Sequence, residues 1–150
     1  MSSQASSQLK LDSALRDTIN HALDHGRMLS VAYVGADGRP ELSFRGSVQT
    51  YSDTQLAIWV RNPEGGIVKA VRDGRIHISL LYGELGPTKA FISLRGRGRI
   101  DNSEAVRQKV YSSAPELERN LDKERKGVPL IIDLDSVEGF FQGNALKMHR

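Results

Sequence analysis

The sequence predicts a mainly β protein with flanking helices, in which about six mostly antiparallel strands close or partly close into a barrel. The first observation is a series of apolar, strand-length segments separated by turns rich in Gly, Pro, Asn and Asp. These segments cover residues 28–34, 41–51, 55–61, 75–82, 89–101, 128–134 and 137–142. The second observation is that helical spacing of apolar residues is confined to short stretches, at residues 11–26, 67–73, 103–111 and 116–126.

The length of 150 residues fits one domain with a single core. Residues 1–10 are rich in Ser and Gln and are predicted to be a disordered tail, and residues 11–150 are predicted to form the domain. The turn-forming residues at 35–40 and 62–66 separate elements of that domain and are too short to be linkers.

The composition excludes several classes of site and location. Because the chain has no cysteine, it has no disulfide, thiolate metal ligand or cysteine nucleophile, which suits a reducing compartment. The longest apolar runs, such as residues 128–134, are too short to cross a bilayer, and residues 1–8 lack the apolar stretch of a secretion signal. We therefore expect a cytoplasmic protein without membrane contact.

The net charge of +3 favours anionic partners such as phosphorylated cofactors, acidic metabolites or nucleic acid. Nucleic acid is the least favoured of these, because the chain has no block of Lys and Arg residues. Aromatic residues make up only 6% of the chain, too few to predict a platform for base stacking.

Two patterns of polar residues have a structural and a functional interpretation. His21 and His25 have the spacing of a two-histidine metal site, but no clear third ligand accompanies them, so we expect no metal. Arg95, Arg97 and Arg99 share one face of a predicted strand, which is either a solvated face or an anion-binding stripe. The chain has no Gly-x-Ser-x-Gly motif, so hydrolase chemistry is not expected.

Three segments stand out together as candidates for a functional site. They are Phe44-Arg45-Gly46-Ser47-Val48-Gln49, then Ile58-Trp59-Val60-Arg61 with the following Gly-Gly turn and Lys69, and finally residues 137–150. Together with "SVAYVGADGRPELSFRGSV", "RIHISLLYG", "RGRGRI" and "FFQGNALKMH", their order and spacing resemble the pyridoxamine-5′-phosphate-oxidase-like family of flavin-binding split barrels. The resemblance covers nearly the whole chain after the tail.

The resemblance implies a split barrel that binds flavin mononucleotide (FMN) at the interface of a homodimer and oxidises or reduces a small molecule. It puts Arg45 and Ser47 on a strand that contacts the ribityl phosphate chain and the ring edge, and Lys147 and His149 at places associated with substrate contact. No side chain is assigned as a catalytic acid or base. The expected cofactor-binding residues are Arg45, Gly46, Ser47, Val48, Ile58, Trp59, Val60, Arg61, Gly66, Lys69 and Phe141.

The chain departs from the family pattern at several places, and Phe91 or Ser93 stands where the oxidases have a flavin-contacting glutamine. Residues 64–66 stand where the family often has Ser-Arg-Lys to hold phosphate, so we expect the N–H groups from Gly66 onward and the charge of Lys69 to replace it. The oxidases' Arg-Pro segment has no counterpart after Asp101, so a true vitamin-B6 oxidase is not expected. A deazaflavin-dependent reductase and a non-catalytic flavin- or haem-binding protein stay open as alternatives.

The candidate residues also have purely structural interpretations. In the structural interpretation, Arg45 forms an ion pair at the rim of the barrel, and Trp59 lies in the core or in a dimer interface. The homodimer is expected partly because Trp59 and the Phe140-Phe141 pair are hard to cover in so small a barrel.

Overall fold

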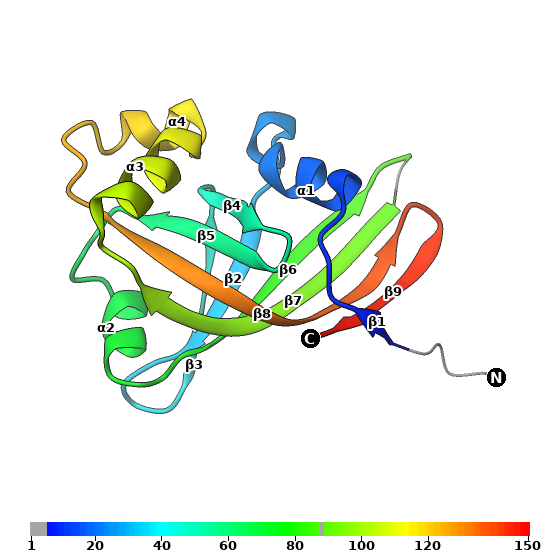
Figure 1. Cartoon of the computed structure of the whole chain (residues 1–150), viewed down its shortest axis with the longest axis horizontal. Coiled ribbons are helices and arrows are strands. Elements are labelled where there is room, and N and C mark those ends of the chain that lie inside the picture. The colour runs from blue at the N-terminus through cyan, green and yellow to red at the C-terminus, as the bar shows by residue number, and fades with distance from the viewer. Residues whose placement is uncertain (1–5, 88) are drawn as a thin grey trace.

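The computed structural model describes residues 6–87 and 89–150, which form one curled sheet with helices at its ends and on its outside (Figure 1). The helices are α1 (Ser13–Asn20), α2 (Gly66–Arg72), α3 (Glu104–Ser113) and α4 (Glu116–Asn120), and a 3-10 turn lies at Leu23–His25. The strands are β1 (Ser7–Gln8), β2 (Leu29–Val34), β3 (Pro40–Arg45), β4 (Val48–Ser52), β5 (Gln55–Val60), β6 (His77–Leu85), β7 (Lys89–Ile100), β8 (Val128–Phe141) and β9 (Asn144–His149). The mainly β class is confirmed, with nine strands in the described chain rather than about six.

Strand β8 is the centre of the sheet. It pairs with β7 along its length, with β5 through its first half and with β9 through its second half. From β7 the sheet continues through β6 and β2 to β3, and β4 pairs with β5. All these pairings are antiparallel, and β1 adds a short parallel contact to β9. Within residues 6–87 and 89–150, β3 pairs with β2 alone, so the barrel is split between β3 and the β4–β5 hairpin.

The interior of the barrel is a single apolar cluster. Inward-facing strand residues such as Val31, Ile58 and Ile92 are fully buried in it. Helix α2 contributes Ile67 and Val68 to the same cluster, so α2 covers part of the barrel interior. Because inward and outward side chains alternate along a strand, the next residues on these strands face the outside of the barrel.

Helix α1 covers the barrel beside β4. Asp12 caps it, because the Asp12 carboxylate accepts a hydrogen bond from the Leu15 N–H at 2.9 Å. Leu15 and Ile19 bury the inner side of the helix in the barrel core. At the last turn, the Asn20 side chain accepts a hydrogen bond from the Thr50 N–H at 2.8 Å, which fixes α1 to β4.

Helix α3 covers a second, smaller apolar cluster on the outside of β5 and β8 (Figure 1). This outer cluster contains Ala57, Trp59, Val110, Tyr111 and Ile131. The aromatic rings of Trp59 and Tyr111 meet edge to face, with centroids 5.1 Å apart. The outer surface of the sheet is therefore covered by helices at the β5 side.

The expected strand over residues 41–51 is broken in the structure. The chain turns at residues 46–47 and separates β3 from β4. The Ser47 hydroxyl holds this turn, because it donates a hydrogen bond of 2.9 Å to the carbonyl of Trp59 on β5. The alternation of apolar residues continues through the turn, so the sequence pattern did not indicate it.

The expected strands at 128–134 and 137–142 are one continuous strand, β8. A register shift of the β7–β8 pairing between Arg95 and Gly96 accommodates Asp135, so the ladder continues across it. The expected helix at 116–126 ends at Asn120, because the Asp122 carboxylate accepts hydrogen bonds from the N–H groups of Lys126 and Gly127.

The expected disordered tail is ordered in its second half. Residues 1–5 lie outside the described residues, but Ser7 and Gln8 pair with Met148 and His149 of β9, and Leu9 is buried. This contact is made through the main chain at the edge of the sheet. Because Ser7 and Gln8 are polar, the sequence shows no alternation of apolar residues from which this pairing could be predicted.

We predict that Gly139→Ala destabilises the fold far more than Gly143→Ala. Both glycines have positive φ, at +142° and +79°. A Cβ at Gly139 would collide with the carbonyl group of Phe91 on β7, whereas a Cβ at Gly143 meets open space. Both variants share the strain of an alanine at positive φ, but only Gly139→Ala adds overpacking, so its free energy of unfolding is expected to fall by about 1–3 kcal/mol more. Urea denaturation measures the difference, and equal losses in the two variants would contradict it.

Candidate functional site

The turn between β3 and β4 borders a small cavity of about 90 Å³. Its charged lining consists of the Arg45 and Arg61 guanidinium groups and the Glu118 carboxylate. The other lining residues are Met28, Phe44, Gly46, Ser47 and Trp59. Because Arg45 ends β3, Arg61 follows β5 and Glu118 lies on α4, this Arg45 cavity brings together three segments that are distant in the sequence.

Arg45 carries a buried donor that lacks a partner. Its Nε has no hydrogen bond to any of the residues that the structure describes. Burial lowers the pKa of Arg45 from its ordinary value; Tyr33 and Glu118 oppose this shift and Arg61 adds to it. A guanidinium keeps its proton in a protein, and a buried donor without a partner costs about 1–3 kcal/mol. An anionic oxygen in the cavity would remove this cost, so the site fits a phosphate or carboxylate group.

Glu118 and Arg61 form a loose ion pair beside Arg45. The Arg61 Nε lies 3.7 Å from Glu118 Oε2, which is longer than a hydrogen bond. The Arg61 side chain is half exposed, whereas only 11% of the Glu118 side chain is exposed. The cavity therefore holds two positive groups and one buried negative group.

Four of the expected cofactor-binding residues lie in the barrel core. Val48, Ile58, Val60 and Phe141 are all buried in the main apolar cluster. Their side chains face the interior of the barrel, so a ligand outside the core would contact only their main chain. Ser47 is also buried, and its hydroxyl donates a hydrogen bond to the carbonyl of Trp59.

Trp59 is held in the outer cluster under α3. Its indole N–H donates to the Asp122 carboxylate at 2.9 Å, and the Arg107 guanidinium lies 5.2 Å from its ring centroid. Only 2% of Trp59 is exposed. The expectation that a monomer struggles to cover Trp59 is therefore wrong, because α3 and the 121–127 loop cover it. The structural interpretation of this residue accounts for all these contacts.

Gly66 lies against Tyr33, whose ring packs on the barrel core. A Cβ at Gly66 would contact the Tyr33 hydroxyl, and the same hydroxyl acts on the pKa of Arg45. Tyr33 thus links the start of α2 with the Arg45 cavity. Lys69, by contrast, is exposed on α2 and is not part of the cavity lining.

Lys147 and His149 lie on β9, at the other end of the sheet from Arg45. The His149 Nε2 lies 2.8 Å from Glu138 Oε1 on β8, and Lys147 is exposed opposite the same glutamate. In the order of the sheet, β8, β7, β6 and β2 lie between β9 and β3, and neither Lys147 nor His149 lines the Arg45 cavity.

A large apolar area is exposed on the outside of the sheet from β3 to β8. The pairings show that its residues share one face, because Phe44 and Leu81 both lie opposite Ser30, and Phe91 lies opposite Phe140. Exposure is 68% at Phe44 and 72% at Leu42, and it reaches 79% at Leu85. Of the Phe140-Phe141 pair, it is Phe140 that is exposed here, whereas Phe141 is buried. We call this area the open sheet face, and it consists of Leu42, Phe44, Leu81, Leu85, Phe91 and Phe140.

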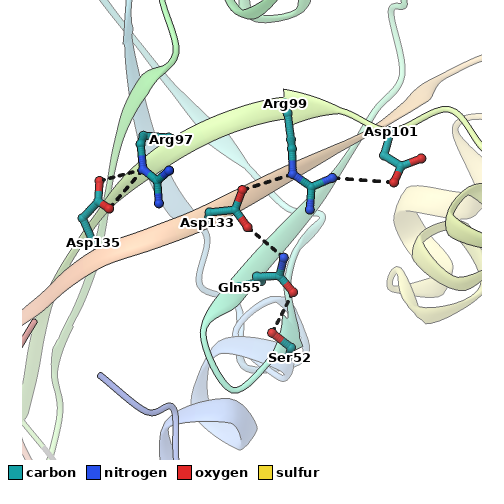
Figure 2. A network of polar contacts seen from close by, with 7 residues as sticks. All are labelled: Ser52, Gln55, Arg97, Arg99, Asp101, Asp133 and Asp135. Atoms are coloured by element: carbon teal, nitrogen blue, oxygen red, sulfur yellow. Dashed lines mark hydrogen bonds and ion pairs between the residues drawn. The ribbon is translucent and has the colours of Figure 1, made fainter. Parts of the chain in front are cut away.

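Two of the three arginines in the β7 stripe, Arg97 and Arg99, are paired with aspartates (Figure 2). Arg97 Nε donates to the Asp135 carboxylate at 3.1 Å, and Arg99 Nε donates to Asp133 at 3.1 Å. Burial acts to raise the pKa of Asp133, but hydrogen bonds from Gln55 and Arg99 hold this pKa below its ordinary value. Arg97 and Arg99 therefore support their cross-strand neighbours, which favours the structural interpretation of the stripe.

His21 forms local contacts with aspartates of its own segment. Its ring nitrogens lie 2.9 Å from Asp24 and 3.4 Å from Asp17, and the hydrogen bond to Asp24 raises the pKa of His21. Among residues 6–87 and 89–150, no group of three or more His, Asp or Glu side chains is arranged to hold a metal ion. No helix of the described chain is long and apolar enough to span a bilayer.

Sequence reasoning missed Tyr33, Glu118 and the open sheet face. Tyr33 and Glu118 belong to ordinary strand and helix segments, and only tertiary contacts bring them to Arg45. A signal for the open sheet face was present, because Leu42 and Phe44 alternate with polar residues on β3. That pattern identifies an apolar face but does not say whether the chain itself covers it.

We predict that Asp122→Asn lowers the free energy of unfolding at pH 7 by about 1–2 kcal/mol, because charge-assisted hydrogen bonds are lost. Burial acts to raise the pKa of Asp122, but hydrogen bonds from Trp59, Lys126 and Gly127 outweigh it and hold the pKa below the ordinary 3.8. The stabilisation is therefore complete above pH 3.8 and is lost as the pH falls through the folded-state pKa. The difference between the two proteins should shrink below pH 3.8.

Urea denaturation followed by the fluorescence of Trp59, the one tryptophan of the chain, measures this effect. Glu124→Gln is the matched control, because Glu124 lies in the same loop and pairs at the surface with Lys126. A difference between wild type and Asp122→Asn that stays constant from pH 7 to pH 3 would show that the charge of Asp122 is not involved.

Comparison with known proteins gives a consistent result at the level of fold. No family model and no curated protein sequence matches this chain. Among solved structures, general stress protein 26 from Bacillus anthracis superposes with a TM-score of 0.63 at 15% identity, covering 89% of this chain and 98% of that one. A protein from Clostridium acetobutylicum, related to general stress protein 26 of B. subtilis and described as of the pyridoxinephosphate oxidase family, has a TM-score of 0.64 at 12% identity, with 92% and 96% covered.

An FMN-binding protein from Syntrophomonas wolfei has a TM-score of 0.61 at 8% identity, with 84% of this chain and 86% of that chain covered. Identities this low carry the arrangement of strands and helices but not the activity. The resemblance expected from the sequence is confirmed in the backbone: the chain has the split-barrel fold of pyridoxamine-5′-phosphate-oxidase-like proteins.

Proposed function

We propose that this protein is an FMN-binding oxidoreductase that works as a homodimer, with the cofactor phosphate held in the Arg45 cavity. The observation that carries the proposal is the buried, unpartnered Nε of Arg45 at the split of the barrel. Its chemistry calls for an anion, and the fold is that of proteins among which one is described as FMN-binding. The proposal thus combines one site with one fold.

The Arg45 cavity suits one end of such a cofactor. Its volume of about 90 Å³ is well below the roughly 300–1,000 Å³ of pockets that enclose a whole small ligand. A phosphate is small enough for the cavity, and guanidinium groups hold it with charge-assisted hydrogen bonds. The flavin ring would then lie outside, along Phe44, which lines the cavity and also belongs to the open sheet face.

A second copy of the chain supplies what one chain lacks. The open sheet face exposes six large apolar side chains on one surface, which is typical of an interaction site. In a two-fold dimer the same face meets itself, so each Arg45 cavity gains a wall from the partner. We propose that Lys147 and His149 of one chain serve the site at the other chain's Arg45, because neither residue lines the Arg45 cavity of its own chain.

The bound flavin would supply two-electron redox chemistry by accepting or delivering hydride. The residues of this chain would hold its phosphate at Arg45 and Arg61, orient its ring against Phe44 and exclude water with the open sheet face. The absence of an Arg-Pro segment after Asp101 removes a substrate-phosphate site, so turnover of pyridoxamine phosphate is expected to be near background.

The absorption spectrum of the purified protein is the first test of this proposal. Flavin bands would support it. A strong Soret band would instead support the haem alternative, and a deazaflavin spectrum the reductase alternative. A colourless protein that binds none of the three in titration would overturn the proposed function.

We predict that Arg45→Ala weakens FMN binding by roughly ten- to a hundredfold, because it removes a charged partner of the phosphate. Binding of riboflavin, which lacks the phosphate, should change little. Quenching of flavin fluorescence measures both affinities, and a urea melt shows whether folding is affected. Arg39→Ala is the control, since Arg39 is an exposed turn residue and its loss makes the same change of charge. If Arg45→Ala left the affinity for FMN unchanged, Arg45 would be a structural residue.

We predict that Leu42→Asp converts the dimer into a monomer at micromolar concentration. A charge within an apolar interface must be desolvated without a partner, which opposes association. Leu121→Asp is the control, because Leu121 is an exposed leucine that follows α4 and lies outside the open sheet face. Sedimentation equilibrium measures the mass of each variant. A wild-type monomer, or dissociation by both substitutions, would contradict an interface at the open sheet face.

A further inference from the structure

Glu118 is a buried carboxylate inside the cavity that is proposed to hold a phosphate. It comes from α4, a helix of five residues, and 8% of the residue is exposed. Its carboxylate lies 3.7 Å from Arg61 and acts electrostatically on Arg45. Burying a charge is costly unless it is paired, so the two arginines are what permits a carboxylate at this place.

Gly46 makes the room for this carboxylate. A Cβ at Gly46 would collide with Glu118 Oε1 and would lie 3.3 Å from its Cδ. The carboxylate therefore lies directly against the β3–β4 turn, next to the residue that follows Arg45 in the chain. It occupies space that an anion bound to both arginines would need.

From this geometry, and resting on the proposed function, we infer that Glu118 is a resident anion that lowers the affinity of the Arg45 cavity for a phosphate in proportion to the charge on that phosphate. Two guanidinium groups and one carboxylate leave the cavity with a net charge of +1. This charge attracts a phosphate less strongly than the two arginines would without the carboxylate. A phosphate monoester carries about −1.5 to −2 near neutral pH, so it meets repulsion from Glu118 unless the carboxylate moves out.

Glu118 is thereby a specificity-determining residue rather than a catalytic one. With Glu118 in place, the attraction of the two arginines for a phosphate is reduced, and the reduction is larger for a doubly charged phosphate than for a singly charged one. Full access of a doubly charged phosphate requires displacement of the Glu118 side chain, because carboxylate and phosphate would otherwise share one small desolvated space. Neutralising Glu118 should then strengthen the binding of each ligand in proportion to the charge on its phosphate.

The test compares three flavins on wild type and Glu118→Gln at pH 8, where the FMN phosphate is doubly charged. The probes are FMN, riboflavin 4′,5′-cyclic phosphate, which is singly charged, and riboflavin, which is uncharged. Glu118→Gln should raise the affinity for FMN by roughly tenfold, that for the cyclic phosphate by less, and that for riboflavin not at all, since it removes like-charge repulsion. Glu116→Gln is the matched control, because Glu116 is an exposed glutamate on the same helix.

Two results would overturn the inference. Unchanged or weaker FMN binding in Glu118→Gln would show that Glu118 only positions Arg61. Equal gains for FMN and riboflavin would show that the substitution loosens the site without a charge effect. If Glu118→Gln fails to fold, Glu118→Ala takes its place, with the same order of gains expected for FMN, the cyclic phosphate and riboflavin, and equal gains for all three would contradict the inference.

Inorganic phosphate separates this inference from the proposed function. If neither protein binds a flavin, the proposed function fails, but phosphate should still raise the unfolding temperature of Glu118→Gln more than that of wild type. Potassium chloride at matched ionic strength is the control for screening. Equal shifts in the two proteins would show that Glu118 does not compete with an anion.

Discussion

Strand β8, 14 residues long, pairs with β7 from Leu130 to Phe141, with β5 on one side of the register shift at Asp135 and with β9 on the other. This change of partner divides the outer surface of the sheet. On the β5 side, α3 and the Asp122 loop cover Trp59. On the β9 side, nothing in the described chain covers Phe91 and Phe140, which stay exposed. The covered and open parts of the molecule therefore both follow from how one strand shares its hydrogen bonds.

The same topology leaves β3 and β4 as two edges joined by a short turn, and the Arg45 cavity lies at that turn. A barrel closed by pairing of these strands would leave no room there for a buried guanidinium without a partner. Arg45 is thus held in a place where a donor is desolvated and unused. Lys147 and His149 lie on β9, with four strands between β9 and β3 in the order of the sheet, and they do not line this cavity.

Charge is distributed differently at the two groups of arginines. On β7, Arg97 and Arg99 meet aspartates across the strand pair, so their charge is used within the fold (Figure 2). At the cavity, two arginines share one carboxylate, Glu118, at a distance beyond hydrogen bonding. The arginines on β7 have hydrogen-bonded carboxylate partners, whereas the Nε of Arg45 at the cavity has none in the described chain. This contrast is why the function is proposed at Arg45 and not at the arginine stripe.

The sequence by itself determined the mainly β class, most of the strands and the candidacy of Arg45 and Gly46, because strand alternation and turn residues act over a few neighbouring positions. It placed Phe141 among the cofactor residues, but the register of β8 buries Phe141 and exposes Phe140. Tertiary structure alone decided the break at residues 46–47, the covering of Trp59 by α3 and the arrival of Glu118 in the cavity. These features depend on contacts between segments far apart in the chain, and no local pattern of residues encodes such contacts.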